Sequence, residues 1–351
     1  MRRPCGTFDT SYGQDLAIAR TRFQIIMSIV SAVLFFCVMP FIVSSDILSK
    51  VNIIAITIIA AIGLNILTGY CGQLNFGHAA FVAVGAYISA MLINHLHWSW
   101  WATLPFAAFG TALIGLIFGL PSLRIKGFYI AVTTLAAFYI IMFIILRGGN
   151  VTGGIYGLKV GSINFFGIPI DDEKKFFFLI AGFLVVMTFF AKNIVRGRVG
   201  RAFIAVRDND LAAELMGIDI FKYKLIAFAV CSAYAGVAGS LFAAYYIYVS
   251  VDQFTFRESI WYIGFIIVGG MGSITGTLFG VIFLKVLDFV VTSAAPGLST
   301  ALPILGSQMI SSVMLIMFGV VIILFLILEP RGLYHRWELL KASVRFWPLT
   351  Y

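Results

Sequence analysis

Six residues between positions 65 and 78 differ in chemical type from the apolar sequence around them. Amide and imidazole side chains donate and accept hydrogen bonds, and each glycine weakens a helix by up to about 1 kcal/mol relative to alanine. The sequence has no nucleophile–base pair and no metal-ligating cluster, so we expect no catalytic residue, no metal site and no cofactor. The chemistry that remains is hydrogen bonding to polar backbone or to a polar solute. The six residues are Asn65, Gly69, Gly72, Gln73, Asn75 and His78.

The composition indicates whether water or lipid surrounds the folded chain. The chain has 351 residues, of which 61% are hydrophobic and 11% are charged, and its mean hydropathy is +1.02. A soluble domain has about 45–50% apolar and about 25% charged residues. The formal net charge is +9. Because the basic residues gather in short loops beside apolar segments, they indicate orientation in a lipid bilayer rather than nucleic-acid binding.

Ten segments reach or approach the roughly 20 apolar residues that a membrane-spanning helix needs. We expect the eighth and ninth to be short. The predicted fold class is an all-α polytopic membrane protein with about ten transmembrane helices, some of them broken or short. The segments are Phe23–Val43, Val51–Thr68, Ala79–His95, Trp100–Leu120, Gly127–Leu146, Phe176–Ala191, Leu225–Val249, Ile260–Val268 continuing into a glycine-rich stretch, Leu278–Val291 and Ser311–Leu328.

The distribution of lysine and arginine predicts the orientation of these helices. With ten spans, four basic segments fall on one side, which is the cytoplasmic side by the positive-inside rule. They are the N-tail, the loop with Arg124 and Lys126, the loop Lys192–Lys224 and the C-tail. The linker Arg147–Lys175 then lies outside. We therefore expect a cytoplasmic N-tail (1–22), a transmembrane permease domain (23–328) with a cytoplasmic loop (192–224), and a cytoplasmic C-tail (329–351).

Two interpretations fit the polar stretch between positions 65 and 78. Non-helical backbone is tolerated within hydrocarbon only where protein buries it or water reaches it, which would suit a broken helix lining a translocation pathway. Alternatively, glycines allow helices to approach closely and amides bond across them. A second glycine-rich stretch, from Gly269 to Gly280, repeats the spacing of Gly69 and Gly72 at Gly269 and Gly272. Paired interruptions in two halves of a chain favour the pathway interpretation.

A third stretch, from Gly197 to Lys224, is too charged to span a membrane. We expect Asp210 to cap a short helix over Leu211–Met216, and Gly217 to end it. This helix could lie on lipid headgroups or fit a groove on a partner protein. The chain has no G-x-x-x-x-G-K-[ST] motif, so any ATP that drives its activity would bind to another subunit.

Four stretches form an ordered set of motifs: Gly69–Tyr87, Gly197–Lys224, GGMGSITGTLFG from Gly269, and EPRGL from Glu329. Together they resemble the LivM-type permease of branched-chain amino acid ABC importers. The resemblance implies a non-enzymatic transport subunit of the bacterial inner membrane, with a LivH-type permease, two ATP-binding subunits and a periplasmic substrate-binding protein as partners. Residues that would couple to the ATP-binding subunits are Arg207, Asp208, Asn209, Asp210, Leu211, Ala212, Ala213, Glu214, Leu215 and Gly217.

Other functions fit parts of the same pattern. Related permeases that carry urea, amides or other amino acids share these motifs, and no residue identifies the cargo. A secondary transporter working alone would need ion-coupling carboxylates within its spans. The sequence offers mainly Asp288 for that role.

Overall fold

The computed structural model describes residues 26, 39–123, 129–161, 164–165, 168–169, 172–301, 316, 319–325, 327–329 and 332–346. Helices dominate these residues, which confirms the all-α polytopic class. The helices are α3 (Met39–Ile42), α4 (Ser45–Asn65), α5 (His78–Leu96), α6 (Trp100–Leu123), α7 (Tyr129–Arg147), α8 (Glu173–Arg196), α9 (Arg198–Asp208), α10 (Asp210–Leu215), α11 (Ile220–Tyr246), α12 (Phe256–Gly269), α13 (Ile274–Ala301) and α15 (Gly332–Phe346).

The remaining elements are short. A π-helical turn, η2 (Ile66–Tyr70), continues α4, and two 3₁₀ turns follow at η3 (Gly154–Tyr156) and η4 (Val251–Gln253). Strand β1 (Leu158–Lys159) pairs antiparallel with β4 (Tyr248–Val249), and β2 (Asn164–Phe165) pairs antiparallel with β3 (Ile168–Pro169).

Seven of the described helices are long and apolar enough to cross a membrane. They coincide with the predicted second to seventh and ninth spans. Helix α12 has only 14 residues, as expected for the eighth span, because the glycine turn ends it. The ninth span was predicted to be short, and this was wrong: α13 is a helix of 28 residues. The predicted first and tenth spans lie largely outside the described residues, so the number ten stays a prediction.

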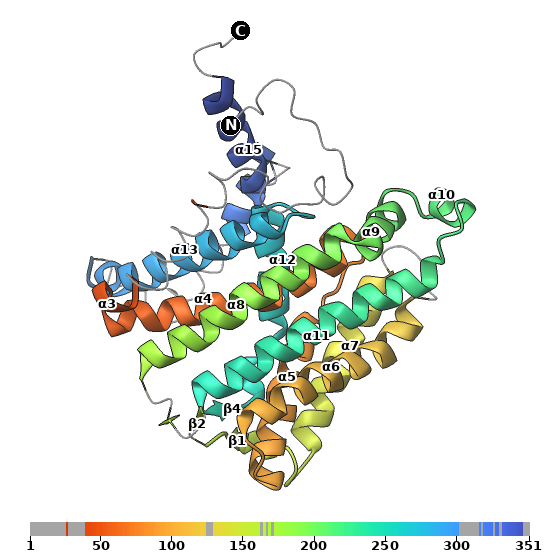
Figure 1. Ribbon diagram of the computed structural model, residues 1–351. Coiled ribbons are helices and arrows are strands. Elements are labelled where there is room, and N and C mark those ends of the chain that lie inside the picture. The colour runs from red at the N-terminus through yellow and green to blue at the C-terminus, as the bar shows by residue number, and fades with distance from the viewer. Residues whose placement is uncertain are drawn as a thin grey trace.

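Helix α11 runs the length of the bundle and connects its two ends. It begins beside α9 and α10 and ends at β4, so α10 and the β1–β4 pair lie at opposite ends (Figure 1). Its glycines allow a close crossing with α5, since a Cβ on Gly239 would collide with the backbone of Val82. Small residues at helix crossings are typical of membrane bundles. This crossing fixes α5 beside α11 and thereby orients the chain that precedes α5.

The helices differ in how much of their surface the chain itself covers. In the most apolar window of α4 and its π-turn, 83% of residues are buried, against 17% in that of α8. The centre of the bundle is therefore α4. Helix α8 faces outward, where lipid or a partner subunit would cover its apolar side chains.

Candidate functional site

The two glycine interruptions lie side by side in the folded chain. Asn65, the last residue of α4, joins them: its Oδ1 accepts a hydrogen bond from the backbone N–H of Gly272 at 3.0 Å. Its Nδ2 donates to the carbonyl oxygen of Ser273 at 2.9 Å and to Oγ1 of Thr277 at 2.8 Å. Asn65 is fully buried. One side chain thus ties the end of α4 to the turn between α12 and α13.

Arg207, near the end of α9, reaches the same place from the charged segment. Its guanidinium donates to the backbone carbonyl of Gly69 at 2.9 Å, and to one carboxylate oxygen of Asp208 at 3.0 and 2.9 Å. The carbonyl of Gly69 lies in η2, where the helix is ending and its last carbonyls lack helical partners. Arg207 supplies that missing donor. We call the set formed by Asn65, Gly69, Gly272 and Arg207 the glycine junction.

Glycine is required in the junction for two physical reasons. Gly272 has φ +77°, a region that L-residues rarely adopt, and a Cβ there would lie 3.0 Å from a guanidinium nitrogen of Arg207. A Cβ on Gly69 would collide with Oδ1 of Asn65 and with the backbone nitrogen of Gly272. The predicted echo between the two glycine stretches therefore corresponds to a physical contact between their turns.

The other polar residues of the first stretch lie close by but make different contacts. Gln73 is buried and lines a cavity described below. Asn75 folds back on its own chain, with Oδ1 accepting from the N–H of Gly77 at 2.8 Å. His78 is fully buried at the start of α5, where Nε2 lies 2.9 Å from the carbonyl oxygen of Ala60. Neither Asn75 nor His78 is among the residues that line this cavity.

The two glycines predicted in the second glycine stretch also make different contacts. Gly272 belongs to the glycine junction, whereas Gly269 packs against α13, where a Cβ would lie 3.2 Å from the Cα of Gly280 and closer still to Gly276. The close-packing interpretation thus describes Gly269, while Gly272 bonds to Asn65.

Helix α10 has an N-cap different from the predicted one. Asp210 is its first residue, and Asn209 is the cap: its Oδ1 accepts from the N–H of Ala212 at 3.0 Å. Asn209 takes this role because its backbone is extended at φ −159°, as a cap residue requires, and its short side chain reaches the third residue on. Gly217, with φ +81°, follows the helix as predicted.

Helix α10 exposes an unusually large apolar surface. Ala213 is its buried residue. Leu211 is 66% exposed, Leu215 is 89% exposed, and the following Met216 is 83% exposed. Apolar side chains projecting this far from a bundle are typical of a contact surface for another molecule.

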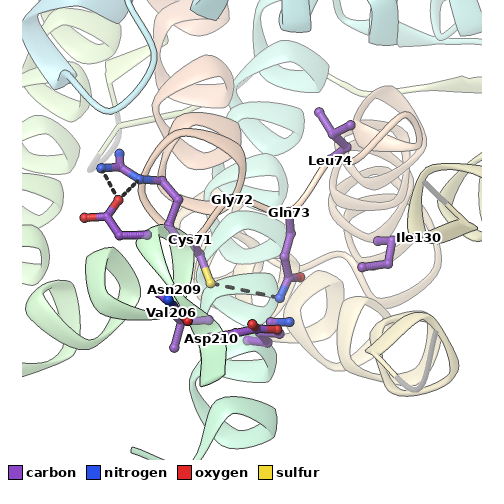
Figure 2. A pocket seen from close by; sticks show the side chains of 11 residues that line it. Cys71, Gly72, Gln73, Leu74, Ile130, Val206, Asn209 and Asp210 are labelled. Carbon is purple, nitrogen blue, oxygen red and sulfur yellow. Dashed lines mark hydrogen bonds and ion pairs between the residues drawn. The ribbon is translucent and has the colours of Figure 1, made fainter. Parts of the chain in front are cut away.

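A cavity of about 560 Å³ separates the first glycine stretch from the segment that leads into α10 (Figure 2). Cys71, Gly72, Gln73 and Leu74 form one side of it, and Val206 to Asp210 form another, together with Ile130 and Lys224. Within the described part of the chain, no three His, Cys, Asp or Glu side chains group as metal ligands would. The chemistry that this arrangement offers is hydrogen bonding and ionic contact.

Several residues of the site have no obvious signal in the sequence. Two of them accept hydrogen bonds from backbone groups of the first glycine stretch: Thr134 Oγ1 accepts from the N–H of Phe76 at 3.1 Å, and Ser259 Oγ accepts from the N–H of Ala79 at 3.0 Å. A spacing of four residues at the start of a helix is the one signal that could have found Ser273 and Thr277 as a pair. The missed residues are Thr134, Ser259, Ser273, Thr277 and Lys224.

The carboxylate available for ion coupling lies elsewhere. Asp288 is partly buried in α13, and the ammonium of Lys285 on the same helix lies 5.9 Å from the ring centre of Trp261 and 5.8 Å from that of Phe265. The described residues contain no ion pair between Lys285 and Asp288. Asp288 is not among the residues that line the 560 Å³ cavity.

Replacing Gly72 by leucine is expected to destabilise the turn. Gly72 has φ +75°, which costs an L-residue about 1–2 kcal/mol, and a Cβ there would lie 2.9 Å from Cγ of Arg207. We expect a lower thermal unfolding midpoint for the purified protein. Gly72→Asn should lose less, because asparagine tolerates this backbone region. Equal midpoints for the leucine variant and the wild type would contradict the strain argument.

Comparison with known proteins identifies the family. The chain is 34% identical over 271 residues to the high-affinity branched-chain amino acid transport system permease protein LivM of Escherichia coli K12, an alignment covering 70% of this chain and 64% of that relative. It is 27% identical over 315 residues to a probable LivM of Methanocaldococcus jannaschii, covering 78% of this chain and 89% of the relative. It is also 24% identical over 256 residues to the LivH permease of Salmonella typhimurium, covering 65% of this chain and 79% of the relative.

These relatives confirm the resemblance to LivM-type permeases, although the chain aligns with less than two thirds of the Escherichia coli protein. No solved structure matches the chain. A family model described as branched-chain amino acid transport system / permease component matches residues 46–328, and the chain therefore belongs to that family of transport permeases.

Proposed function

We propose that this chain is a permease subunit of an ATP-driven importer in the bacterial inner membrane, and that it forms half of the pathway for branched-chain amino acids. The other half is a LivH-type permease, two ATP-binding subunits act from the cytoplasm, and a periplasmic protein delivers the substrate. The chain has no ATP site of its own. Both termini and the segment 192–224 face the cytoplasm, with 1–22 and 329–351 as tails beside the membrane domain 23–328.

The observation that carries this proposal is the exposed apolar face of α10. A helix of six residues is not stable alone, so packing and partners must hold it. The cap of Asn209 and the burial of Ala213 fix its base, while Leu211 and Leu215 project outward. We propose that these side chains enter a groove on an ATP-binding subunit.

The glycine junction connects the docking helix α10 to the end of α4. Arg207 lies two residues before the cap of α10 and bonds to Gly69, which lies where α4 gives way to non-helical chain. Movement of α10 with the ATP-binding subunits is therefore passed to the end of α4 and, through Asn65, to the α12–α13 turn. Gly69, Gly72, Gln73, Asn75, His78 and Gly272 then form a hinge region of the pathway.

Reconstitution of the complete importer tests the proposal. We expect proteoliposomes containing this chain, its partner permease and the ATP-binding subunits to accumulate labelled leucine, isoleucine or valine only with ATP and the binding protein. Accumulation of urea or amides instead would show that the proposed cargo is wrong, while the chain would still belong to an ATP-driven importer. Full uptake after ATP depletion, without ATP-binding subunits, would contradict the importer class itself.

Leu215→Asp tests the docking surface directly. Leu215 is 89% exposed, so the variant is expected to fold and insert normally, yet it places a charge where we propose an apolar contact. Loss of a buried leucine contact is worth about 1.5–3 kcal/mol, so co-purification of the ATP-binding subunits should fall roughly tenfold or more. A matched control is Ile155→Asp, since Ile155 is 77% exposed and lies in η3, outside α10 and the coupling segment. Unchanged co-purification of the Leu215 variant would argue against docking at α10.

A further inference from the structure

The cavity between the first glycine stretch and α10 has walls of mixed chemistry. Leu74, Ile130 and Val206 give it apolar surface, while Lys224, Asp210 and Gln73 bring a cation, a carboxylate and an amide to it. Its volume of about 560 Å³ is typical of sites for small molecules, which range over about 300–1,000 Å³. Figure 2 shows the side chains of Cys71 and Gln73 pointing toward the segment that carries Val206, Asn209 and Asp210.

Two of the charged groups that line the cavity are already paired with each other. The guanidinium of Arg207 is bonded to Asp208 at 2.9 Å and to the carbonyl of Gly69. Lys224 and Asp210 have no ion-pair partner among the residues that the structure describes. The cavity thus presents one free cation and one free carboxylate, which matches a ligand carrying both signs of charge.

A third group points to the same ligand. Gln73 is only 2% exposed, and its Oε1 has no hydrogen-bond partner in the described chain. Its Nε2 lies 4.0 Å from Sγ of Cys71, which is a weak contact. Leaving a buried acceptor unpaired is costly, so an amide oxygen in this wall favours a ligand that donates hydrogen bonds. A primary ammonium has three donors and can satisfy Asp210 and Gln73 together.

We propose that this cavity binds a zwitterionic α-amino acid with an apolar side chain. Its carboxylate pairs with Lys224, its ammonium pairs with Asp210 and donates to Oε1 of Gln73, and its side chain packs on Leu74, Ile130 and Val206. Two parts of this inference rest on the proposed function: that the cavity faces the cytoplasm, and that its ligand is the transported cargo.

Occupancy of this cavity bears on the coupling segment. Asn209, the cap of α10, and Arg207, the donor to Gly69, both belong to its wall. A ligand held between Lys224 and Asp210 restrains the movement of α10 relative to the first glycine stretch. The cavity is thus a site at which accumulated amino acid slows further import from the cytoplasmic side.

Binding of tritiated L-leucine to the complete importer in nanodiscs, without the periplasmic protein, tests the site. We expect saturable binding that weakens about tenfold or more in both Lys224→Met and Asp210→Asn, since each removes one charged partner of the ligand. Lys222→Met, two residues away on the same helix, is the matched control and should bind like the wild type. Unchanged affinity in Lys224→Met and Asp210→Asn would overturn the proposal.

Two analogues of leucine separate zwitterion recognition from apolar binding. 3-Methylbutylamine lacks the carboxylate and 4-methylpentanoate lacks the ammonium, so neither should displace leucine at concentrations where leucine displaces itself. Competition by both analogues as strong as that of leucine would overturn the site.

ATP-driven leucine uptake by the same preparation distinguishes this inference from the proposed function. If uptake is normal but leucine binding is unchanged in Lys224→Met and Asp210→Asn, the cavity site is wrong and the proposed importer function stands. If leucine is not taken up but its binding depends on Lys224, leucine is not the cargo and the cavity site stands.

Discussion

Replacing Arg207 by methionine is expected to reduce ATP-driven uptake by roughly tenfold or more while ATP hydrolysis continues. Methionine removes the charge-assisted hydrogen bond to Gly69, which is worth about 1.5–3 kcal/mol, and about 1.4 kcal/mol corresponds to a tenfold change in a population. The ATP-binding subunits would still move α10, but that movement would no longer reach the end of α4. The measurement is leucine uptake and phosphate release by the same proteoliposomes.

Two further variants make this result specific. Arg207→Lys keeps the charge but lacks the planar fork that bonds Asp208 and Gly69 at once, so it should recover uptake only in part. Arg198→Met removes an exposed arginine from the start of the same helix, and we expect it to transport normally. Uptake and hydrolysis falling together in Arg207→Met would instead indicate that α10 no longer docks.

The sequence predicted the class of fold because membrane helices depend mainly on local composition. A run of apolar residues long enough to span lipid must form a helix, since no other single segment satisfies its own backbone there. The error at the ninth span has a different origin. The predicted span, Leu278–Val291, already contained Lys285 and Asp288, but α13 begins at Ile274, inside the glycine-rich stretch, and continues to Ala301. Lys285 is accommodated within this helix against the rings of Trp261 and Phe265.

The residues of the site were found more easily than their partners. Gly69, Gly72 and Asn65 could be selected because glycines and amides are costly in an apolar helix unless something requires them. Their contacts could not be predicted, since Asn65 bonds to residues more than 200 positions away and Arg207 reaches Gly69 across 138 positions. Such pairings depend on how helices pack, which hydrophobic patterns along one chain do not specify.

The cap of α10 shows the limit of local reasoning at a smaller scale. Asp210 and Asn209 are both good cap residues, and the sequence does not say which one has extended backbone. The structure decides for Asn209, because α9 ends at Asp208 and the chain turns at the next residue. This one-residue shift places Asp210 inside the helix and leaves its carboxylate free to line the cavity.

Replacing Asn65 by leucine is expected to have the largest effect on the bundle itself. The variant removes three hydrogen bonds and leaves the N–H of Gly272 without its acceptor, whereas the Thr277 hydroxyl still donates to the carbonyl oxygen of Ser273. The loss is on the order of 3 kcal/mol, since an unpaired buried group costs about 1–3 kcal/mol. We expect a thermal unfolding midpoint several degrees lower, together with faster hydrogen exchange of the amides at 269–273.

Two asparagine variants separate loss of the junction from loss of stability in general. Asn65→Asp keeps the acceptor for Gly272 but loses both donations, so it should lie between wild type and Asn65→Leu. Asn52 lies in the first half of α4, away from the glycine junction, and its Nδ2 donates to a carboxylate oxygen of Glu173 at 3.1 Å. Asn52→Leu should therefore lower the unfolding midpoint without speeding exchange at 269–273. If Asn52→Leu and Asn65→Leu gave the same exchange pattern, the junction would be an ordinary buried contact, and transmission of movement from α10 to the α12–α13 turn would have to follow another route.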